Sequence, residues 1–127
     1  MADAEANKEA VMGLLQTAFL EGKPEEGVAR YMGSRYTQHN PQAPDGPDGF
    51  IGYVNGFKAQ FPEMSYDVKR VIAEGDLVVL HGHMKMSPDD RGSAVVDIFR
   101  LEDGKIVEHW DVLQPVPETA VNDNTMF

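Results

Sequence analysis

The chain has 127 residues, a formal net charge of −10 and no cysteine. This length suits one domain with a single core, and the acidic balance argues against binding nucleic acid or an anionic membrane, since either needs a basic face. Without cysteine there is neither a disulfide scaffold nor a thiol nucleophile, and zinc would lack its soft ligands. The start of the chain lacks a secretory signal pattern and no segment has the length of a membrane span, so we expect a cytoplasmic protein.

Three helices are predicted in the first half of the chain. Apolar residues recur there at three-four spacing, and prolines stand where the second and third helices would begin. Residues 34–49 are rich in proline and in turn-forming residues, which predicts an irregular loop. The expected helices span residues 3–21, 24–32 and 47–61.

The second half alternates apolar and polar residues, which predicts strands. Helices followed by a run of antiparallel strands indicate one α+β domain over residues 1–127, in which the helices cover one face of a strongly curved, mostly antiparallel sheet. Such a cone-shaped arrangement encloses a pocket lined by alternate strand residues. The expected strands are 64–74, 76–86, 93–102 and 105–114, followed by a tail over 115–127.

The last two strands form a hairpin whose turn decides which side chains share a face. Asp103-Gly104 between alternating apolar residues is a strong hairpin signal. In a two-residue turn, Leu101 opposes Ile106. Asp97 and Trp110 then point to the same side of the sheet.

A three-residue turn, with the glycine in the left-handed conformation, reverses this outcome. Leu101 then opposes Lys105, and Asp97 shares a face with His109, while Asp111 lies diagonally behind. We favour this turn because it gathers the three ionisable groups on one mostly apolar surface. Such groups cost free energy unless they are paired, hydrated or used in function.

The segment DIFRLEDGKIVEHWDVLQPVPE resembles the C-terminal half of SnoaL-like polyketide cyclases, which belong to the nuclear-transport-factor-2-like superfamily. The loop YTQHNPQAPDG and the ending NDNTMF resemble a bacterial branch whose members are often described as aldol-condensation enzymes. The resemblance spans nearly the whole chain. It implies three helices against a curved mixed sheet, a homodimer, and cofactor-free acid–base catalysis in an apolar pocket, with no metal.

The resemblance also implies roles for two residues. The principal acid–base carboxylate of the family lies in the last strand, where Asp111 matches it. Characterised cyclases place a histidine in the preceding strand, and this sequence has Asp97 there. Two carboxylates in a poorly solvated cavity cannot both ionise cheaply, so one is expected to hold its proton near neutral pH. Alternatively, one of them pairs with Arg100, His109 or a backbone amide and only stabilises the sheet.

The histidines offer further candidates. His39, in the proline-rich loop, could polarise a substrate carbonyl at the pocket mouth, or could simply cap the third helix. His81 and His83 share strand parity, so they could line the pocket or bind one metal ion, completed by His39 or Asp97. We favour pocket lining for one of the pair and a hydrogen bond at the rim for the other. His109 is expected to orient a neighbouring carboxylate.

Aromatic side chains are expected to line the pocket, although ordinary core packing accounts for most aromatic stripes. Trp110 packs in the core or at a dimer interface under the favoured turn and becomes a pocket wall under the other. The tail is either a frayed end or a lid over the cavity. The candidates for substrate contact are His81, His109, Tyr36, Phe50, Phe57 and Trp110.

The leading hypothesis is a small enzyme of the cyclase, isomerase or lyase type that acts on an apolar carbonyl compound without a cofactor. Asp111 would be the acid–base group and Asp97 its partner, with His39 and His83 as polarising groups. The first alternative is a non-catalytic protein that binds a hydrophobic ligand in the same fold. The second is a metal-dependent site on His81 and His83.

Overall fold

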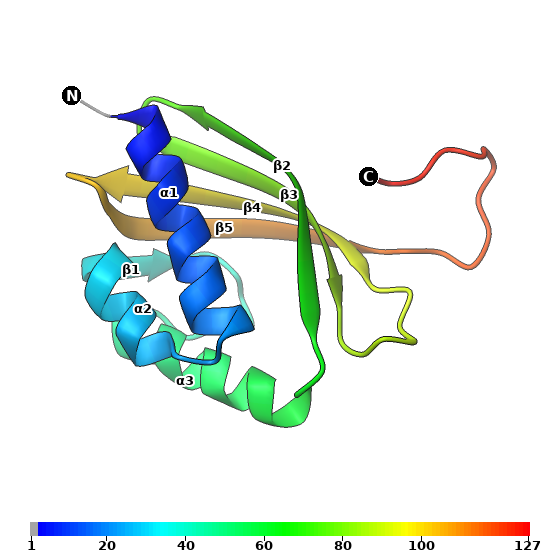
Figure 1. The fold of residues 1–127 in the computed structure, drawn as a ribbon, viewed down its shortest axis with the longest axis horizontal. Helices are drawn as coiled ribbons and strands as arrows, with labels where there is room; N and C mark the ends of the chain where they lie inside the picture. Colours follow the sequence, from blue (N-terminus) through cyan, green and yellow to red (C-terminus); the bar gives the residue numbers. More distant parts are fainter. Residues whose placement is uncertain (1–2) are drawn as a thin grey trace.

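The computed structural model describes residues 3–127, which form helices packed against one sheet (Figure 1). Three α-helices and one π-helix precede or interrupt the strands. Pro24 begins the second α-helix with two glutamates in its first turn, which favours this start. The helices are α1 (Ala4–Leu14), η1 (Leu15–Leu20), α2 (Pro24–Tyr31) and α3 (Gly46–Gln60).

The first helical stretch begins where the sequence predicts but does not stay α-helical. Asp3 caps α1, its carboxylate accepting the backbone N–H of Ala6 at 3.1 Å. From Leu15 the chain continues as the π-helix η1, and Gly22 ends it at a φ of +70°. π-Helical turns are rare and often lie beside functional sites. None of the helices within residues 3–127 combines the length and the apolar character that a bilayer crossing demands.

Five strands form one curved mixed sheet in the order β1-β5-β4-β3-β2. β1 runs parallel to β5, and the other neighbours are antiparallel. The helices cover one face, and the C-terminal segment loops back on the side of β2 and β3 (Figure 1). The strands are β1 (Met32–Gln38), β2 (Ser65–Glu74), β3 (Leu77–Lys85), β4 (Ser93–Glu102) and β5 (Lys105–Pro115).

The prediction of an irregular loop over residues 34–49 is wrong in its first part. Residues 34–38 belong to β1, which starts directly at the end of α2. Its neighbour β5 supplies hydrogen-bonding partners that local turn propensity does not reveal, so pairing overrides the local signal. Only the proline-rich half, between Gln38 and Gly46, connects elements without regular structure.

The β4–β5 hairpin has the two-residue turn that we did not favour. Asp103 and Gly104 have φ values of +51° and +79°, as a tight type I′ turn requires, and Leu101 pairs with Ile106. A β-bulge then follows, because Arg100 pairs with Glu108 and leaves one extra residue, Val107, on β5. The extra residue therefore lies inside the strand and not in the turn.

The bulge restores the parity that the three-residue turn was expected to provide. Beyond it, Phe99 pairs with His109 and Asp97 pairs directly with Asp111. The prediction that Asp111 lies diagonally to Asp97 is wrong, because these two residues pair directly. The three ionisable groups nevertheless lie together on the helix-covered face. The core beside them consists mainly of buried residues of α1, β1, α3 and the central strands: Val11, Leu14, Ala18, Met32, Tyr36, Phe50, Val54, Val78, Leu80, Phe99, Leu101 and Ile106.

Candidate active site

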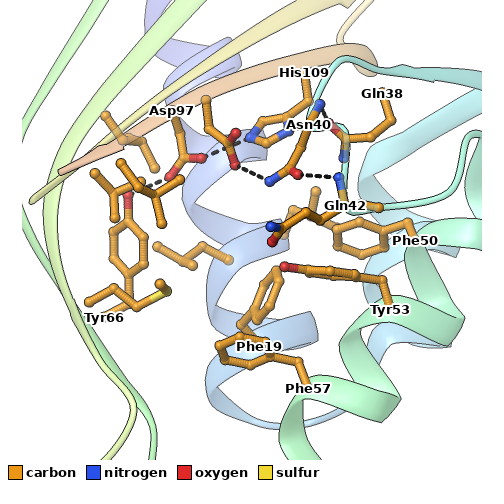
Figure 2. Close-up of a pocket in the computed structure, with 18 of the residues that line it drawn as sticks. Phe19, Gln38, Asn40, Gln42, Phe50, Tyr53, Phe57, Tyr66, Asp97 and His109 are labelled. Carbon is orange, nitrogen blue, oxygen red and sulfur yellow. Dashed lines mark hydrogen bonds and ion pairs between the residues drawn. The ribbon is translucent and has the colours of Figure 1, made fainter. Parts of the chain in front are cut away.

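A cavity of about 200 Å³ lies between the helices and the inner face of the sheet. One side of its wall is apolar and comes from the helices and from methionines of the strand ends. The other side is polar and comes from β4, β5 and the segment after β1 (Figure 2). Besides the polar residues described below, its lining includes Leu14, Leu15, Phe19, Phe50, Phe57, Met64, Leu80, Met84, Met86, Val95, Phe99 and Leu113.

Asp97 is almost buried, with 9% of its surface exposed, and both of its carboxylate oxygens are engaged. Oδ2 accepts the hydroxyl of Tyr66 at 2.5 Å, and Oδ1 lies 2.8 Å from Nε2 of His109. On the other side of the ring, Nδ1 of His109 lies 2.8 Å from Oε1 of Gln38. The side chains therefore form a chain from β2 through β4 and β5 to β1.

The position of one proton in this chain follows from its donors. The backbone N–H of Asn40 can only donate, and it does so to Oε1 of Gln38 at 3.0 Å, which fixes that atom as the amide oxygen. Nδ1 of His109 must then be the donor to the same oxygen. A proton is still needed between Nε2 and Asp97, because two bare acceptors would repel each other at 2.8 Å. The pair of Asp97 and His109 thus shares one proton and carries no net charge.

Asp111 is held differently. Its Oδ2 accepts Nδ2 of Asn40 at 2.9 Å, and the orientation of that amide is fixed because Oδ1 of Asn40 accepts the backbone N–H of Gln42 at 2.8 Å. Oδ1 of Asp111 has no hydrogen-bond partner among residues 3–127. The side chain of Asp111 therefore lines the cavity with one of its two carboxylate oxygens unpaired within residues 3–127.

Three tyrosines at the cavity keep their phenolic protons. Burial raises the pKa of Tyr36 and of Tyr66 far above the ordinary value, and the negative charge of Asp97 adds to the effect. Burial also raises the pKa of Tyr53, followed by the charges of Asp111 and Asp97. All three are neutral phenols at physiological pH and act as hydrogen-bond donors or acceptors, not as anions.

The glycine between the two histidines of β3 makes room for Tyr66. A Cβ at Gly82 would lie 2.3 Å from a ring carbon of that tyrosine, which is closer than carbon atoms approach. The ring can therefore lie across β3 and carry its hydroxyl to Asp97. A glycine inside a strand often marks such a close approach, so the sequence did contain a signal for this contact.

His81 and His83 lie on the outer face of the sheet, away from the cavity. Inward positions on β3 are occupied by Leu80 and Met84, which line the cavity, and strand alternation sends the two histidines outward. Nδ1 of His81 contacts a guanidinium nitrogen of Arg70, and Nε2 of His83 lies 2.7 Å from the carbonyl oxygen of Arg91. Neither histidine lines the cavity, so the predicted substrate contact of His81 and the predicted polarising role of His83 have no support in their positions.

The tail also lies on the outer face. The ring of Phe127 stacks on His83 with 4.2 Å between ring centroids and on His81 with 5.8 Å. The segment therefore does not act as a lid over the cavity within this chain. The expected metal site on the two histidines is also not assembled, since Asp97 lies on the opposite face and His39 pairs with a residue of β5.

A different group has the spacing of metal ligands. Asp97, His109 and Asp111 each offer one ligand atom, and these atoms lie within 4.8 Å of one another; this is the one such group of three or more side chains in residues 3–127. The residues fit a divalent ion in their chemistry, because imidazole and carboxylate are common ligands of divalent ions. The shared proton between Asp97 and His109 is the alternative occupant of the same space.

His39 lies outside the cavity, although the segment that carries it does reach over the polar wall. Its ring stacks on Trp110 at 4.8 Å and 6°, and Nε2 lies 2.7 Å from Oε2 of Glu108. Asn40, the next residue, turns inward to Asp111. The predicted polarising role of His39 over the pocket mouth therefore has no support in its position. Trp110 likewise lies on the outer face and is not a pocket wall.

The remaining predicted contacts do lie in the cavity wall. Tyr36, Phe50, Phe57 and His109 all line it, together with the two aspartates. Tyr36 packs edge-on against Phe50 at 5.7 Å. Five polar residues at the cavity were missed: Gln38, Asn40, Gln42, Tyr53 and Tyr66. Gln38, Asn40 and Gln42 lie in the segment that was predicted to be an irregular loop. In such a segment, helical or strand periodicity gives no information about where a side chain points.

Comparisons with known proteins identify the class of fold. A structure of TsrD from Streptomyces laurentii has a TM-score of 0.73 and 21% sequence identity, covering 89% of this chain and 91% of that one. A protein from Jannaschia sp. CCS1 with the provisional name of a SnoaL-like polyketide cyclase has a TM-score of 0.72 and 22% identity, covering 87% and 86%. At these identities the likeness shows a shared α+β fold.

A third similar structure, from Kribbella flavida DSM 17836, carries the provisional name of a ketosteroid isomerase; it has a TM-score of 0.75 and 17% identity, covering 96% of this chain and 87% of that one. The family model described as the SnoaL-like domain matches residues 13–109. The chain therefore belongs to the SnoaL-like family, as its sequence motifs indicated. A search of curated proteins finds no match. The family match includes Asp97 and His109 and ends just before Asp111.

Proposed function

We propose that the protein is a cofactor-free acid–base enzyme that removes and returns a proton next to the carbonyl of a neutral, largely apolar compound. The reaction would be an aldol-type cyclisation or an isomerisation. The observation that carries the proposal is the free Oδ1 of Asp111, a carboxylate oxygen without a hydrogen-bond partner among residues 3–127 on the wall of an apolar cavity. A base must have such an oxygen available, since the substrate proton has to bind to it.

The second carboxylate supports the first without acting on the substrate. Both oxygens of Asp97 are engaged, and its pairing with His109 has no net charge because the two share a proton. Asp111 can therefore carry its negative charge opposite Asp97 without facing a second uncompensated anion. In this arrangement Asp97 shares a proton with His109, whereas in a paired-aspartate site the two carboxylates share a proton with each other.

The surroundings suit proton transfer. Asn40 holds Asp111 through Oδ2 and leaves the other oxygen in a defined direction. Apolar walls exclude water, so that fixed charges and dipoles act more strongly on the substrate than they would in solution. The net charge of −10 disfavours anionic substrates at long range, which argues for a neutral compound.

The competing proposal is a non-catalytic protein that binds a hydrophobic ligand. It predicts that both aspartates are fully hydrogen-bonded within the protein, and this holds for Asp97 but not for Asp111. The homodimer and the cytoplasmic location stay predictions.

The test is exchange of the protons adjacent to the carbonyl with deuterium in D2O, followed by NMR on a panel of apolar ketones and 1,3-diketones. This assay does not need the physiological substrate. We expect exchange by the unmodified protein and a fall of about 100-fold or more in Asp111→Asn, the range that a single acid–base group contributes. Asp89→Asn, in the exposed turn after β3, is the matched control and should exchange at the original rate.

Retention of the full exchange rate in Asp111→Asn would contradict the proposal. Ligand binding by the unmodified protein without any exchange on the panel would favour the non-catalytic alternative. Metal analysis of the same preparation belongs with this test, because a divalent ion bound by Asp97, His109 and Asp111 would occupy the free oxygen. Activity that disappears with a chelator and returns with the ion would replace the cofactor-free proposal.

A further inference from the structure

We infer that Tyr53 and Gln42 bind the carbonyl oxygen of the substrate and stabilise the negative charge that develops on it. This inference rests on the proposed function, because it assigns the groups that face the substrate opposite the base. It also defines the class of ligand: a carbonyl compound with a removable hydrogen on the adjacent carbon and an apolar remainder.

Tyr53 supplies a free donor from the helical side of the cavity. It lies on α3, and its hydroxyl points into the cavity (Figure 2). That hydroxyl has no hydrogen-bond partner among the residues that the structure describes, whereas the hydroxyls of Tyr36 and Tyr66 are both bonded. The ring is held by stacking on Phe57 at 6.1 Å. Because its pKa is raised by burial and by the nearby carboxylates, Tyr53 remains a donor at neutral pH.

Gln42 supplies a second donor from the segment after β1. Its backbone N–H donates to Oδ1 of Asn40, so the residue that holds Asp111 also fixes the start of the Gln42 side chain. The side-chain amide has no hydrogen-bond partner within residues 3–127, and it points toward the same part of the cavity as the hydroxyl of Tyr53 (Figure 2). The protein thus leaves two donors unused beside one unused carboxylate oxygen.

These three free groups match the needs of the reaction. Oδ1 of Asp111 takes the proton, the electrons of the broken C–H bond form a carbon–carbon double bond, and the carbonyl π electrons move to oxygen. That oxygen becomes negative and requires donors already in position, which Tyr53 and Gln42 provide. Return of the proton to carbon removes the charge again. Attack of the carbon on a second carbonyl group instead moves the charge to the oxygen of that group, which then takes the proton from Asp111 and becomes a hydroxyl. No oxidant, reductant or further reactant is needed.

The rest of the cavity orients the substrate. Phe57, Met64 and Met86 line the apolar part, where a hydrocarbon body would bind. Methionines adapt to irregular shapes, so this end selects for apolar character more than for one outline. The carbonyl group would then be the single polar feature of the ligand that the site recognises strongly.

The experiment measures binding of an oxyanion without turnover. The probe is 4-nitrophenol, whose neutral and ionised forms absorb at different wavelengths, and the background is Asp111→Asn, which imitates the carboxylic acid present after proton removal. We expect the ionised form to bind more tightly than nitrobenzene, a neutral ligand of similar shape. Adding Tyr53→Phe or Gln42→Met should weaken binding of the ionised form by about tenfold each, the usual range for a hydrogen bond to a charged group.

The controls separate this inference from the proposed function. Tyr31→Phe removes a hydroxyl that does not line the cavity and should leave 4-nitrophenolate affinity unchanged. Nitrobenzene affinity should not change in any of these variants, which excludes a collapsed cavity. Equal affinity for the ionised probe with and without Tyr53→Phe and Gln42→Met would overturn the inference, and so would binding of the ionised form no tighter than nitrobenzene. The proposed function fails separately, through undiminished deuterium exchange in Asp111→Asn.

Discussion

The two faces of β5 carry the same kind of pair in opposite surroundings. On the inner face, His109 pairs with Asp97 at 2.8 Å, with side chains 10% and 12% exposed. On the outer face, the adjacent residue Glu108 pairs with His39 at 2.7 Å, and the His39 side chain is 42% exposed. One step along a strand therefore separates a pair enclosed beside a cavity from a pair at the surface. Residue type alone does not distinguish these two cases.

The surroundings decide what each pair can do. Outside, hydrogen bonds from His39 and Arg100 lower the pKa of Glu108, and solvent screens any remaining imbalance of charge. Inside, little water is available to solvate a polar group that has lost its partner. Removing one member of the pair therefore leaves the other buried and unpaired, which lowers the stability of the fold. Loss of an inner partner should therefore cost more stability than loss of an outer one.

The largest expected effect comes from removing the inner carboxylate. Asp97→Ala leaves Nε2 of His109 and the hydroxyl of Tyr66 without a partner, and we expect the free energy of unfolding to fall by about 3 kcal/mol. Glu108→Ala, the outer control, should have a much smaller effect. Urea denaturation of both variants measures the difference, and equal losses would show that the two faces are energetically alike.

The second prediction concerns alkaline pH and the inner tyrosines. Tyr36 and Tyr66 have pKa values raised by burial and by Asp97, above the ordinary value of 10.0. Above pH 10 the unfolded chain releases these protons while the folded chain keeps them, so stability is complete below pH 10 and falls as pH rises further. The expected slope is about 1.4 kcal/mol per pH unit for each buried tyrosine.

This slope can be followed by urea denaturation at several alkaline pH values, with tyrosinate absorbance recorded on the same samples. Ionisation of the two buried phenols should accompany unfolding. If all the tyrosines ionise while the protein remains folded, the inner face is more hydrated than the structure indicates. Tyr66→Phe should reduce the slope by the contribution of one group.

The smallest expected effect is on the outer face of β3. The double variant His81→Gln and His83→Gln should keep the deuterium-exchange rate and the metal content of the unmodified protein, since neither ring lines the cavity. His109→Gln is the inner counterpart and should lower the exchange rate, because it breaks the pairing with Asp97. A loss of exchange or of bound metal in the outer double variant would restore the rejected metal site.

The features predicted correctly from the sequence were those governed by regular period. The apolar spacing of α1 and α3 and the alternation along β2 to β5 follow from side-chain direction in helices and strands. The motifs around Asp111 identified the family. None of these required knowledge of contacts between distant residues.

The errors arose where long-range contacts decide the outcome. β1 forms because β5 lies beside it. The pairing of Gln38 with His109 fixes the end of β1 against β5, and from there Asn40 rather than His39 turns inward. For His81 and His83, parity with Leu77 and Val79 was seen, but Val78 and Leu80 proved to be the inward residues. An alternating strand with apolar residues at both parities does not reveal which face is buried.

The extra residue in β5 has a consequence for protein engineering. A designer who transplants this hairpin by matching the Asp103-Gly104 turn and counting along an ideal ladder would set Trp110, not Asp111, opposite Asp97. Any graft into another scaffold must carry Val107 with its bulge, or the imported side chains of His109 and Asp111 will emerge on the wrong surface.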